Sequence, residues 1–343
     1  MTNAPSPTGA LLVNLGTPDA PRPREVRRYL AEFLSDPRVL DMNAAARWLL
    51  LHGVILRTRP RKSAAAYAKI WTQAGSPLLT NSRALCAGVA RALSGSYHVE
   101  LGMRYGNPSI GAAVSALVAA GVSRIVALPL FPQYSEAATG SAAARIREVV
   151  AALPDPPALT VLGDFHAEAR FIAAFALAVR PALDAFRPDH LLLSYHGLPE
   201  RQVKATDASG RHCLASASCC DAVYAVNARC YRAQSFATSR ALCSALGVAP
   251  ERTSVAFQSR LGRTPWIRPF TDERLPELYA AGVRRLAVAC PSFVADCLET
   301  LEEIGIRARE QWRELGGEAL ALLPCPNAHP AWVDAVAAMI REA

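Results

Sequence analysis

Short runs rich in branched residues and leucine alternate along the chain with alanine-rich stretches in which apolar positions recur with a helical period. In the N-terminal half, strands are predicted at 11–16, 99–106 and 124–132, and the helices that follow them at 26–34, 108–121 and 140–153. In the C-terminal half, strands are predicted at 191–197, 254–259 and 285–293, each again followed by a helical stretch. Strands that alternate with helices in this way are typical of parallel sheets covered on both faces.

The two halves of the chain also resemble one another in sequence. Segment 119–132 matches 280–293, and segment 11–19 echoes 191–200. The first half carries extra residues between its landmarks, which an insertion at 40–75 accounts for. We therefore predict an α/β fold of two similar domains, with a ligand cleft between them at the carboxyl ends of the strands. The predicted domains are 1–157, which includes the insertion 40–75; 158–326, which includes a cysteine-rich insert at 204–232; and 327–343, a C-terminal helix packing back on the first domain.

Composition narrows the class of protein. With 51% hydrophobic and 19% charged residues in 343, the chain can bury large cores, which excludes a disordered protein and a disulfide-stapled miniprotein. The net charge is +8, but 34 of the 37 basic residues are arginine. This excess of arginine over lysine is interpreted as an effect of genome composition and not as a binding surface, so no nucleic acid partner is predicted. No signal peptide precedes the first strand and no apolar run approaches the roughly 20 residues of a membrane span, so a cytoplasmic location is expected.

The predicted strand ends carry the candidate chemistry. They are Asn14–Pro18, Arg104–Tyr105, Pro132–Ser135, Ser194–Gly197, Gln258–Arg260 and Pro291–Glu299. None has the glycine pattern of a dinucleotide or nucleoside triphosphate site, so no nucleotide cofactor is expected.

One histidine and one acidic segment stand out at these ends. His196 directly follows an apolar strand, whereas a structural histidine more often sits inside one. Asp296, Glu299 and Glu303 recur at i, i+3 and i+7, which predicts one face of a helix; such a row is often only a solvated surface. A histidine opposite paired carboxylates can accept protons, pass on a divalent cation, or do both.

A series of motifs in order along the chain resembles the ferrochelatase family over nearly its whole length. The motifs are NLGTP at 14–18, FLSDPRVL at 33–40, GSPLL at 75–79, MRYGNPSI at 103–110, LPLFPQYSEAATGS at 128–141, SYHGLPER at 194–201, QSRLGRTPW at 258–266 and FVADCLETLEEI at 293–304. The resemblance implies two Rossmann-like domains of the class II chelatase type. It also implies a lyase that inserts Fe²⁺, as substrate, into protoporphyrin IX and releases two protons, the last step of haem biosynthesis.

The resemblance assigns roles to individual residues. His196 is implied to bind the metal and accept protons, with Glu299 as its partner across the porphyrin and Asp296 and Glu303 continuing the acidic line. Imidazole and carboxylate ligands suit Fe²⁺. The residues implied to bind the substrate are Leu15, Trp266 and segment 48–56 as apolar walls, Arg59, Tyr67 and Ser76 at the propionates, and Asn14, Arg104, Tyr105, Tyr134 and Ser194 as further pocket residues.

Four cysteines gather in the insert at 204–232, namely Cys213, Cys219, Cys220 and Cys230. Their spacing matches neither a zinc ribbon nor a ferredoxin, and the residues alone leave a 2Fe-2S cluster, a structural zinc site and free thiols open. Some ferrochelatases carry a 2Fe-2S cluster, mostly with ligands near the C-terminus, where this chain has only Cys325. We predict that the four clustered cysteines hold such a cluster. Cys86, Cys243 and Cys290 are interpreted as small apolar residues, and Cys297 is left unassigned.

Several alternatives remain open at this stage. The same fold serves cobalt or nickel chelatases, and ferrochelatases divide between protoporphyrin and coproporphyrin substrates. A tetrapyrrole carrier without catalysis would keep a cleft but would not need both His196 and Glu299. The 40–75 insertion has an apolar tip flanked by arginines, which suits a lip over an apolar ligand or peripheral contact with an anionic membrane. The protein is expected to be a monomer or a homodimer.

Overall fold

The computed structural model describes residues 7–262 and 264–343 and divides into two compact units. The first unit contains residues 7–131, 136–164 and 333–343, and the second contains the remaining described residues, 132–135 and 165–332 without 263. The first unit continues beyond residue 157 because the strand at Ala158–Val161 pairs with the sheet of that unit. In the described part of the chain, no helix is both long and apolar enough to cross a membrane.

The sheet of the first unit is fully parallel. Its strands are β1 (Thr8–Thr17), β2 (Tyr97–Gly106), β3 (Arg124–Pro129) and β4 (Ala158–Val161), in the order β2-β1-β3-β4. The central strand β1 is buried along almost its whole length, and Leu12 pairs with Leu101 on one side and Leu128 on the other. Burial on both faces explains why these strands are continuous apolar runs.

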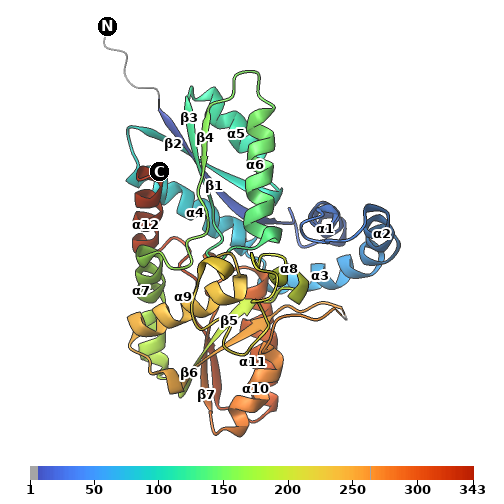
Figure 1. Cartoon of the computed structure of the whole chain (residues 1–343), viewed down its shortest axis with the longest axis vertical. Helices are drawn as coiled ribbons and strands as arrows, with labels where there is room; N and C mark the ends of the chain where they lie inside the picture. The colour runs from blue at the N-terminus through green and yellow to red at the C-terminus, as the bar shows by residue number, and fades with distance from the viewer. Residues whose placement is uncertain (1–6, 263) are drawn as a thin grey trace. The chain divides into compact units, whose positions relative to one another are not determined.

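The second unit repeats this arrangement. Its strands are β5 (His190–His196), β6 (Thr253–Gln258), β7 (Arg285–Ala289) and β8 (Ala319–Leu322), in the order β6-β5-β7-β8. Figure 1 shows the strands of each unit running side by side between helices. The predicted fold of two similar parallel α/β domains is confirmed, because the matched segments of the repeat occupy equivalent strands.

The helices of the first unit cover its sheet and form the insertion. They are α1 (Pro23–Ser35), α2 (Ala44–Leu50), η1 (Leu51–Ile55), α3 (Leu56–Ile70), α4 (Pro77–Ala92), α5 (Ile110–Ala119), η2 (Glu136–Gly140) and α6 (Ser141–Ala151). Val114 and Ile146 bring α5 and α6 into one core with Leu11 and Val13 of β1. The insertion is helical: α2 and α3 lie beside α1, as Figure 1 shows in blue.

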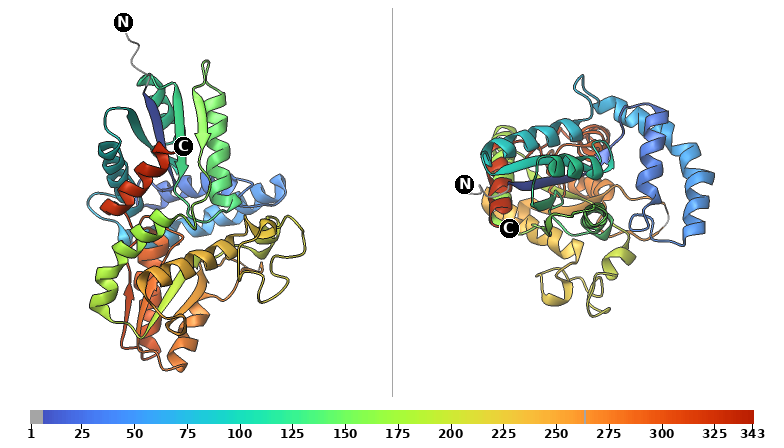
Figure 2. Two further views of the ribbon diagram at one scale, coloured as in Figure 1. Left: turned by 60° about the vertical axis from the view of Figure 1, so that its left-hand side comes forward. Right: turned by 90° about the horizontal axis from the view of Figure 1, so that it is seen from above.

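The second unit has its own core and a less regular insert. Its helices are α7 (Ala169–Phe186), α8 (Glu200–Lys204), η3 (Ala225–Asn227), α9 (Tyr231–Leu246), η4 (Pro250–Arg252), α10 (Thr271–Ala280), η5 (Glu299–Ala308), α11 (Arg309–Glu314) and the start of α12 (Pro330–Arg341). Trp312, Leu275 and Ile304 pack against Leu192 and Val288 of the sheet. The cysteine-rich insert lies between α8 and α9 and is mostly turns, seen as the yellow-green irregular ribbon in Figure 2.

Candidate active site

His196 is held at the carboxyl end of β5 from both sides. The pairing of β5 with β7 ends at Leu193, whereas its pairing with β6 continues as far as His196 and Gln258. The N–H of His196 donates to Ser292 Oγ at 3.1 Å, and the N–H of Gly197 donates to the Gln258 carbonyl at 2.8 Å. Because both neighbouring peptide groups are bonded, the direction in which the His196 ring leaves the strand is fixed.

The ring of His196 has a defined tautomer. Its Nδ1 lies 2.6 Å from the carbonyl oxygen of Gly197. A carbonyl oxygen can only accept, so Nδ1 carries the proton in the neutral ring and the lone pair lies on Nε2. The rings of Trp266 and Phe293 flank the imidazole, with centroids 6.4 and 6.5 Å away. A Cβ at position 197 would lie 2.9 Å from the Gln258 carbonyl oxygen, which explains the glycine.

The acidic segment departs from the predicted helical face. Asp296 precedes the helix, and its carboxylate accepts hydrogen bonds from Asn327 Nδ2 at 2.7 Å, Thr300 Oγ1 at 3.2 Å and the Cys325 N–H at 3.3 Å. The predicted i, i+3, i+7 face is therefore wrong for Asp296, whose side chain closes the turn that leads into η5. The helix η5 is also a π-helix, with i→i+5 hydrogen bonds that a 3.6-residue period does not describe.

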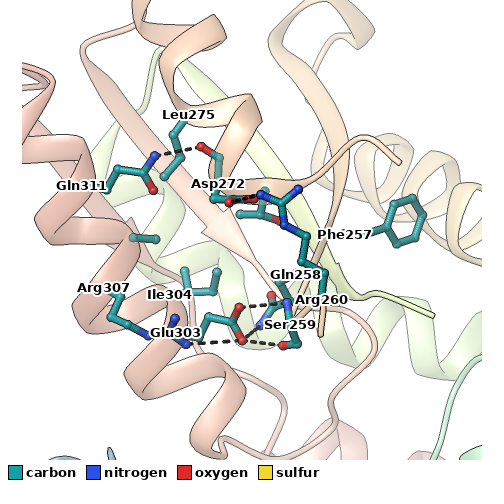
Figure 3. A pocket seen from close by; sticks show the side chains of 12 residues that line it. Phe257, Gln258, Ser259, Arg260, Asp272, Leu275, Glu303, Ile304, Arg307 and Gln311 are labelled. Atoms are coloured by element: carbon teal, nitrogen blue, oxygen red, sulfur yellow. Dashed lines mark hydrogen bonds and ion pairs between the residues drawn. The ribbon is translucent and has the colours of Figure 1, made fainter. Parts of the chain in front are cut away.

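Glu303 lies on η5 within a hydrogen-bonded group that Figure 3 shows. Its carboxylate accepts from the Ser259 N–H at 2.9 Å, from Ser259 Oγ, and from Gln258 Nε2 at 3.4 Å, and Arg307 Nη2 lies 3.8 Å away. This group lines a pocket of about 220 Å³ beyond the end of β6.

Glu299 begins η5 and is the partner of the cysteine that the sequence left unassigned. Cys297 is fully buried, and burial together with the charge and hydrogen bonding of Glu299 raises the pKa of its thiol well above the usual value. The thiol therefore stays protonated and donates to the Glu299 carboxylate. The Glu299 carbonyl oxygen accepts from Gln258 Nε2 at 2.8 Å.

Gln258 connects the histidine and acidic segments, and it was not among the predicted site residues. Its Oε1 accepts from Ser194 Oγ at 2.7 Å, and Ser194 Oγ also lies 2.8 Å from Thr271 Oγ1. Ser194 has no exposed surface, so its side chain supports Gln258 from inside the unit. The available signal was the position of Gln258 at the end of a predicted strand; its contact with Glu299 spans 41 residues and depends on the tertiary fold.

A buried ion pair organises the strand ends of the first unit. Asp36 Oδ2 accepts from Arg104 Nη2 at 2.6 Å, from Tyr105 OH at 2.9 Å and from Ser141 Oγ at 2.5 Å. Burial alone would raise the pKa of Asp36, but the hydrogen bonds, led by that of Ser141, and the charge of Arg104 lower it. The Tyr105 side chain is completely buried, so Arg104 and Tyr105 are fixed by Asp36, a residue that the sequence did not single out.

Other predicted substrate residues of this unit fall into two groups. Asn14 and Ser76 are buried near the end of β1, where Asn14 Nδ2 donates to Ser82 Oγ at 3.1 Å and Ser76 Oγ accepts from Thr17 at 2.9 Å. The adjoining Leu15 is partly buried.

The second group lies on α3. Tyr67 packs edge-on against Trp71, with ring centroids 6.1 Å apart. Arg59 is half-buried, and burial lowers the pKa of its guanidinium. Within the described part of the chain, that guanidinium makes no hydrogen bond or ion pair, which leaves it available for an anionic group.

Two predicted pocket residues lie in the second unit. The N–H of Tyr134 donates to Gln234 Oε1 at 2.6 Å, and the guanidinium of Arg229 lies 5.2 Å from the centre of its ring. The indole N–H of Trp266 donates to the Leu261 carbonyl at 2.9 Å, which holds this ring beside His196.

Two polar side chains fold the cysteine-rich insert. Asp207 accepts from the N–H groups of Ser209, His212 and Cys213 at 2.9, 2.6 and 2.7 Å, and these bonds hold the pKa of its carboxyl well below the usual range. Asn227 is completely buried and donates to the carbonyls of Cys219 and Ala222 at 3.1 and 3.0 Å. The insert therefore has a specific conformation although it lacks regular structure.

The four clustered cysteines are all buried and lie together. Cys219 and Cys220 have sulfur atoms 3.6 Å apart, and Cys230 hydrogen-bonds to both Cys213 and Cys220. Arg232 Nη1 lies 3.1 Å from the Cys220 sulfur. Among the described residues, no group of three or more His, Cys, Asp or Glu side chains is arranged to hold a single metal ion.

Comparison with known proteins places these features in a family. Residues 7–343 match the family model described as Ferrochelatase. Curated ferrochelatases from Coxiella burnetii and Azotobacter vinelandii are 47% and 49% identical, covering 97% and 96% of this chain and 93% and 97% of theirs. A ferrochelatase from Legionella pneumophila is 47% identical, covering 97% of this chain and 98% of its own.

Solved structures agree on the fold. The sirohydrochlorin chelatase SirB from Bacillus subtilis subspecies spizizenii, in complex with cobalt, aligns with a TM-score of 0.54 at 12% identity, over 98% of this chain and 94% of its own. SirB from Bacillus subtilis with Fe³⁺ aligns with a TM-score of 0.55 at the same identity. The parallel α/β units thus have the same fold as the chelatase SirB. From its sequence matches, the chain belongs to the ferrochelatase family.

Proposed function

We propose that this protein is a protoporphyrin ferrochelatase, which inserts Fe²⁺ into protoporphyrin IX to give protohaem and two protons. Family membership supports the reaction class. The observation that carries the proposal is the His196 imidazole, whose Nε2 lone pair is set by the bond from Nδ1 to the Gly197 carbonyl. Metal insertion needs groups that bind Fe²⁺ and accept pyrrole protons, and the single Nε2 lone pair of a neutral imidazole can take either one at a time.

In this proposal, His196 receives protons from the macrocycle and Glu299 is its carboxylate partner. Glu303, hydrogen-bonded to Ser259 and Gln258, continues the acidic route toward solvent along η5. Arg59 supplies a guanidinium for a propionate, because it is half-buried and has no partner among the described residues. We assign Tyr67 and Ser76 to the same carboxylates, and Leu15 and Trp266 to the apolar surface of the ring. Asn14, Arg104, Tyr105, Tyr134 and Ser194 complete and support the pocket in this proposal.

The test is an anaerobic assay with Fe²⁺ and either protoporphyrin IX or coproporphyrin III, followed by the absorbance of the metallated product. We expect haem formation with protoporphyrin at a higher kcat/KM than with coproporphyrin. A higher kcat/KM with coproporphyrin would show that the protein is a chelatase whose substrate is coproporphyrin. Porphyrin binding without metallation would identify a carrier and reject the enzyme.

We further propose that Cys213, Cys219, Cys220 and Cys230 hold a 2Fe-2S cluster. Four buried thiols in contact, with an arginine beside one sulfur, fit a cluster that takes two thiolates at each iron and carries negative charge. Without a bound cation, burial raises the pKa of the Cys213 and Cys219 thiols, and the hydrogen bond with Cys230 together with burial raises that of Cys220, so loading would release protons. When bound, the cluster would supply a one-electron redox centre.

We also propose that the insertion contacts membrane surfaces. Trp48, Leu49 and Val54 expose 61, 62 and 53% of their surface on α2 and η1, and Arg47 and Arg57 lie beside them in sequence. Exposed apolar side chains with neighbouring arginines suit an anionic lipid interface. Sedimentation with phosphatidylglycerol vesicles should be lost in a Trp48→Ser, Leu49→Ser double variant. Equal sedimentation of the variant and the parent protein would reject this contact.

A further inference from the structure

On the β7 side of the sheet, the backbone N–H of His196 is hydrogen-bonded to a side chain and not to a neighbouring strand. β7 ends at Ala289, so no β7 residue pairs with His196, and Ser292 Oγ accepts the His196 N–H at 3.1 Å instead. The strand on the other side, β6, still pairs with His196 through Gln258. The position of His196 relative to the β7 side of the sheet therefore depends on one serine hydroxyl.

That hydroxyl has a second partner, Tyr231. The Tyr231 side chain is buried and its hydroxyl is hydrogen-bonded to Ser292. Tyr231 is the first residue of α9, and Cys230 is the N-cap of that helix. The Cys230 carbonyl accepts from the Gln234 N–H at 3.0 Å, so the residue that begins the helix also belongs to the cysteine cluster. Two hydrogen bonds thus separate α9, at the residue next to Cys230, from the backbone of His196.

We infer that Ser292 and Tyr231 are positioning residues that couple the conformation of the cysteine-rich insert to the placement of His196. Whatever fixes Cys230 against Cys213 and Cys220 also fixes the start of α9, and with it the Tyr231 hydroxyl. Opening of the insert releases Ser292 and loosens the His196 peptide. The structural coupling does not depend on the proposed function; only its expected effect on catalysis rests on that function.

The direct test is hydrogen exchange of the His196 amide in the full chain without substrate. Ser292→Ala removes the acceptor and should speed this exchange at least about tenfold, because the amide loses its partner. Tyr231→Phe keeps the buried ring, removes one hydroxyl, and should give a smaller increase in the same direction. Ser244→Ala, at an exposed serine of α9, is the matched control and should leave the exchange unchanged.

A kinetic measurement separates positioning from general damage. Ser292→Ala and Tyr231→Phe should lower kcat about threefold to tenfold while the porphyrin KM stays within about twofold, since the lost bond orients His196 and does not contact the ring. A variant that is only less stable would have a smaller active fraction and so a lower apparent kcat. The concentration of active sites is therefore measured by porphyrin titration, and kcat is calculated per active site. If the wild-type chain forms no metalloporphyrin, the proposed function fails, and the exchange experiment still decides the coupling.

The coupling itself is tested by a double-mutant cycle with Cys213→Ser, which disturbs the insert at a cysteine outside α9 and contacts Cys230. Cys213→Ser should speed exchange of the His196 amide in the parent chain and add little in the Tyr231→Phe background. Equal effects in both backgrounds, or an unchanged His196 amide in Ser292→Ala and Tyr231→Phe, would overturn the inference.

Discussion

The side-chain amide of Gln258 donates to the backbone carbonyl of Glu299 at 2.8 Å, and so joins the end of β6 to the start of η5. The backbone carbonyl of the same glutamine accepts the N–H of Gly197, directly after His196. One residue therefore sets the relative position of the segments that carry the histidine and the glutamate.

Replacing Gln258 by leucine should damage both stability and turnover. The Glu299 carbonyl would lose the Gln258 amide and Ser194 Oγ would keep only Thr271, and a buried group left unsatisfied costs about 1–3 kcal/mol in the free energy of unfolding. We expect a lower urea midpoint with an unchanged m value, and a kcat that falls more than stability alone explains. Gln73→Leu, at an exposed glutamine, is the control. A variant with the parental kcat would show that Gln258 does not position the active-site residues.

His196→Ala should nearly abolish iron insertion while porphyrin binding persists, because apolar area and carboxylate contacts hold the ring. A general base contributes roughly 10²–10⁴-fold to rate, so turnover above about a tenth of the parental value would argue against this role. Glu299→Gln, which keeps the shape and removes the charge, should show a similar loss. His98→Ala, at an exposed histidine of β2, should retain full activity. Single-turnover absorbance measures iron insertion, and fluorescence quenching of the porphyrin measures its binding.

Single serine substitutions at 213, 219, 220 and 230 should each bleach the purified protein in the visible range. Cys86→Ser and Cys243→Ser should leave the colour unchanged, because these cysteines lie on α4 and α9 away from the insert. Iron and acid-labile sulfide should be found in equal amounts, two of each per chain. One zinc per chain with no sulfide would show that the four cysteines form a structural zinc site and not a cluster.

Arg59→Leu should raise the porphyrin KM about tenfold or more with little change in kcat, because a charge-assisted contact contributes roughly 1.5–3 kcal/mol and lies far from the reacting nitrogens. Arg59→Lys should recover part of the loss, since lysine keeps the charge without the planar fork. Esterified porphyrin serves as the comparison substrate. If the leucine variant weakens acid and ester equally, Arg59 supports the insertion and does not contact a propionate.

His190 should make stability depend on pH. Burial, followed by the charges of Arg274 and Arg252, lowers the pKa of His190 from its ordinary 6.5 to about 4. Between these values the unfolded chain binds the proton and the folded chain does not, so the stabilisation is complete above pH 6.5 and is lost as pH falls toward 4.

Urea unfolding at pH 7 and pH 4.5 measures this effect. His190→Gln can still hydrogen-bond to Ser254 Oγ, which lies 2.9 Å from Nε2 of the parent side chain. The variant should lose about 1–2 kcal/mol less than the parent on acidification, since each unit by which the pKa is lowered corresponds to about 1.4 kcal/mol. Equal losses in both proteins would show that His190 titrates normally.

Much of this protein follows from local patterns in its sequence. The apolar runs specify β1, β3, β5 and β7, because strands buried on both faces need apolar residues at every position. The internal repeat specifies two equivalent units, and the ordered motifs specify the family before any contact is known. His196 was identified because the carboxyl ends of parallel strands are where chemistry collects.

The tertiary structure alone decided how these residues are held. Asp296 belongs to a turn with Asn327 and not to a helical face, because its partners lie 31 residues away and η5 is a π-helix that a 3.6-residue period cannot reveal. Gln258 and Ser292 lie at the ends of predicted strands, but only the tertiary structure shows that each supplies a hydrogen bond to the peptides around His196. A hydrogen bond forms within about 3 Å in space whatever the separation along the chain, so only folding brings such partners together.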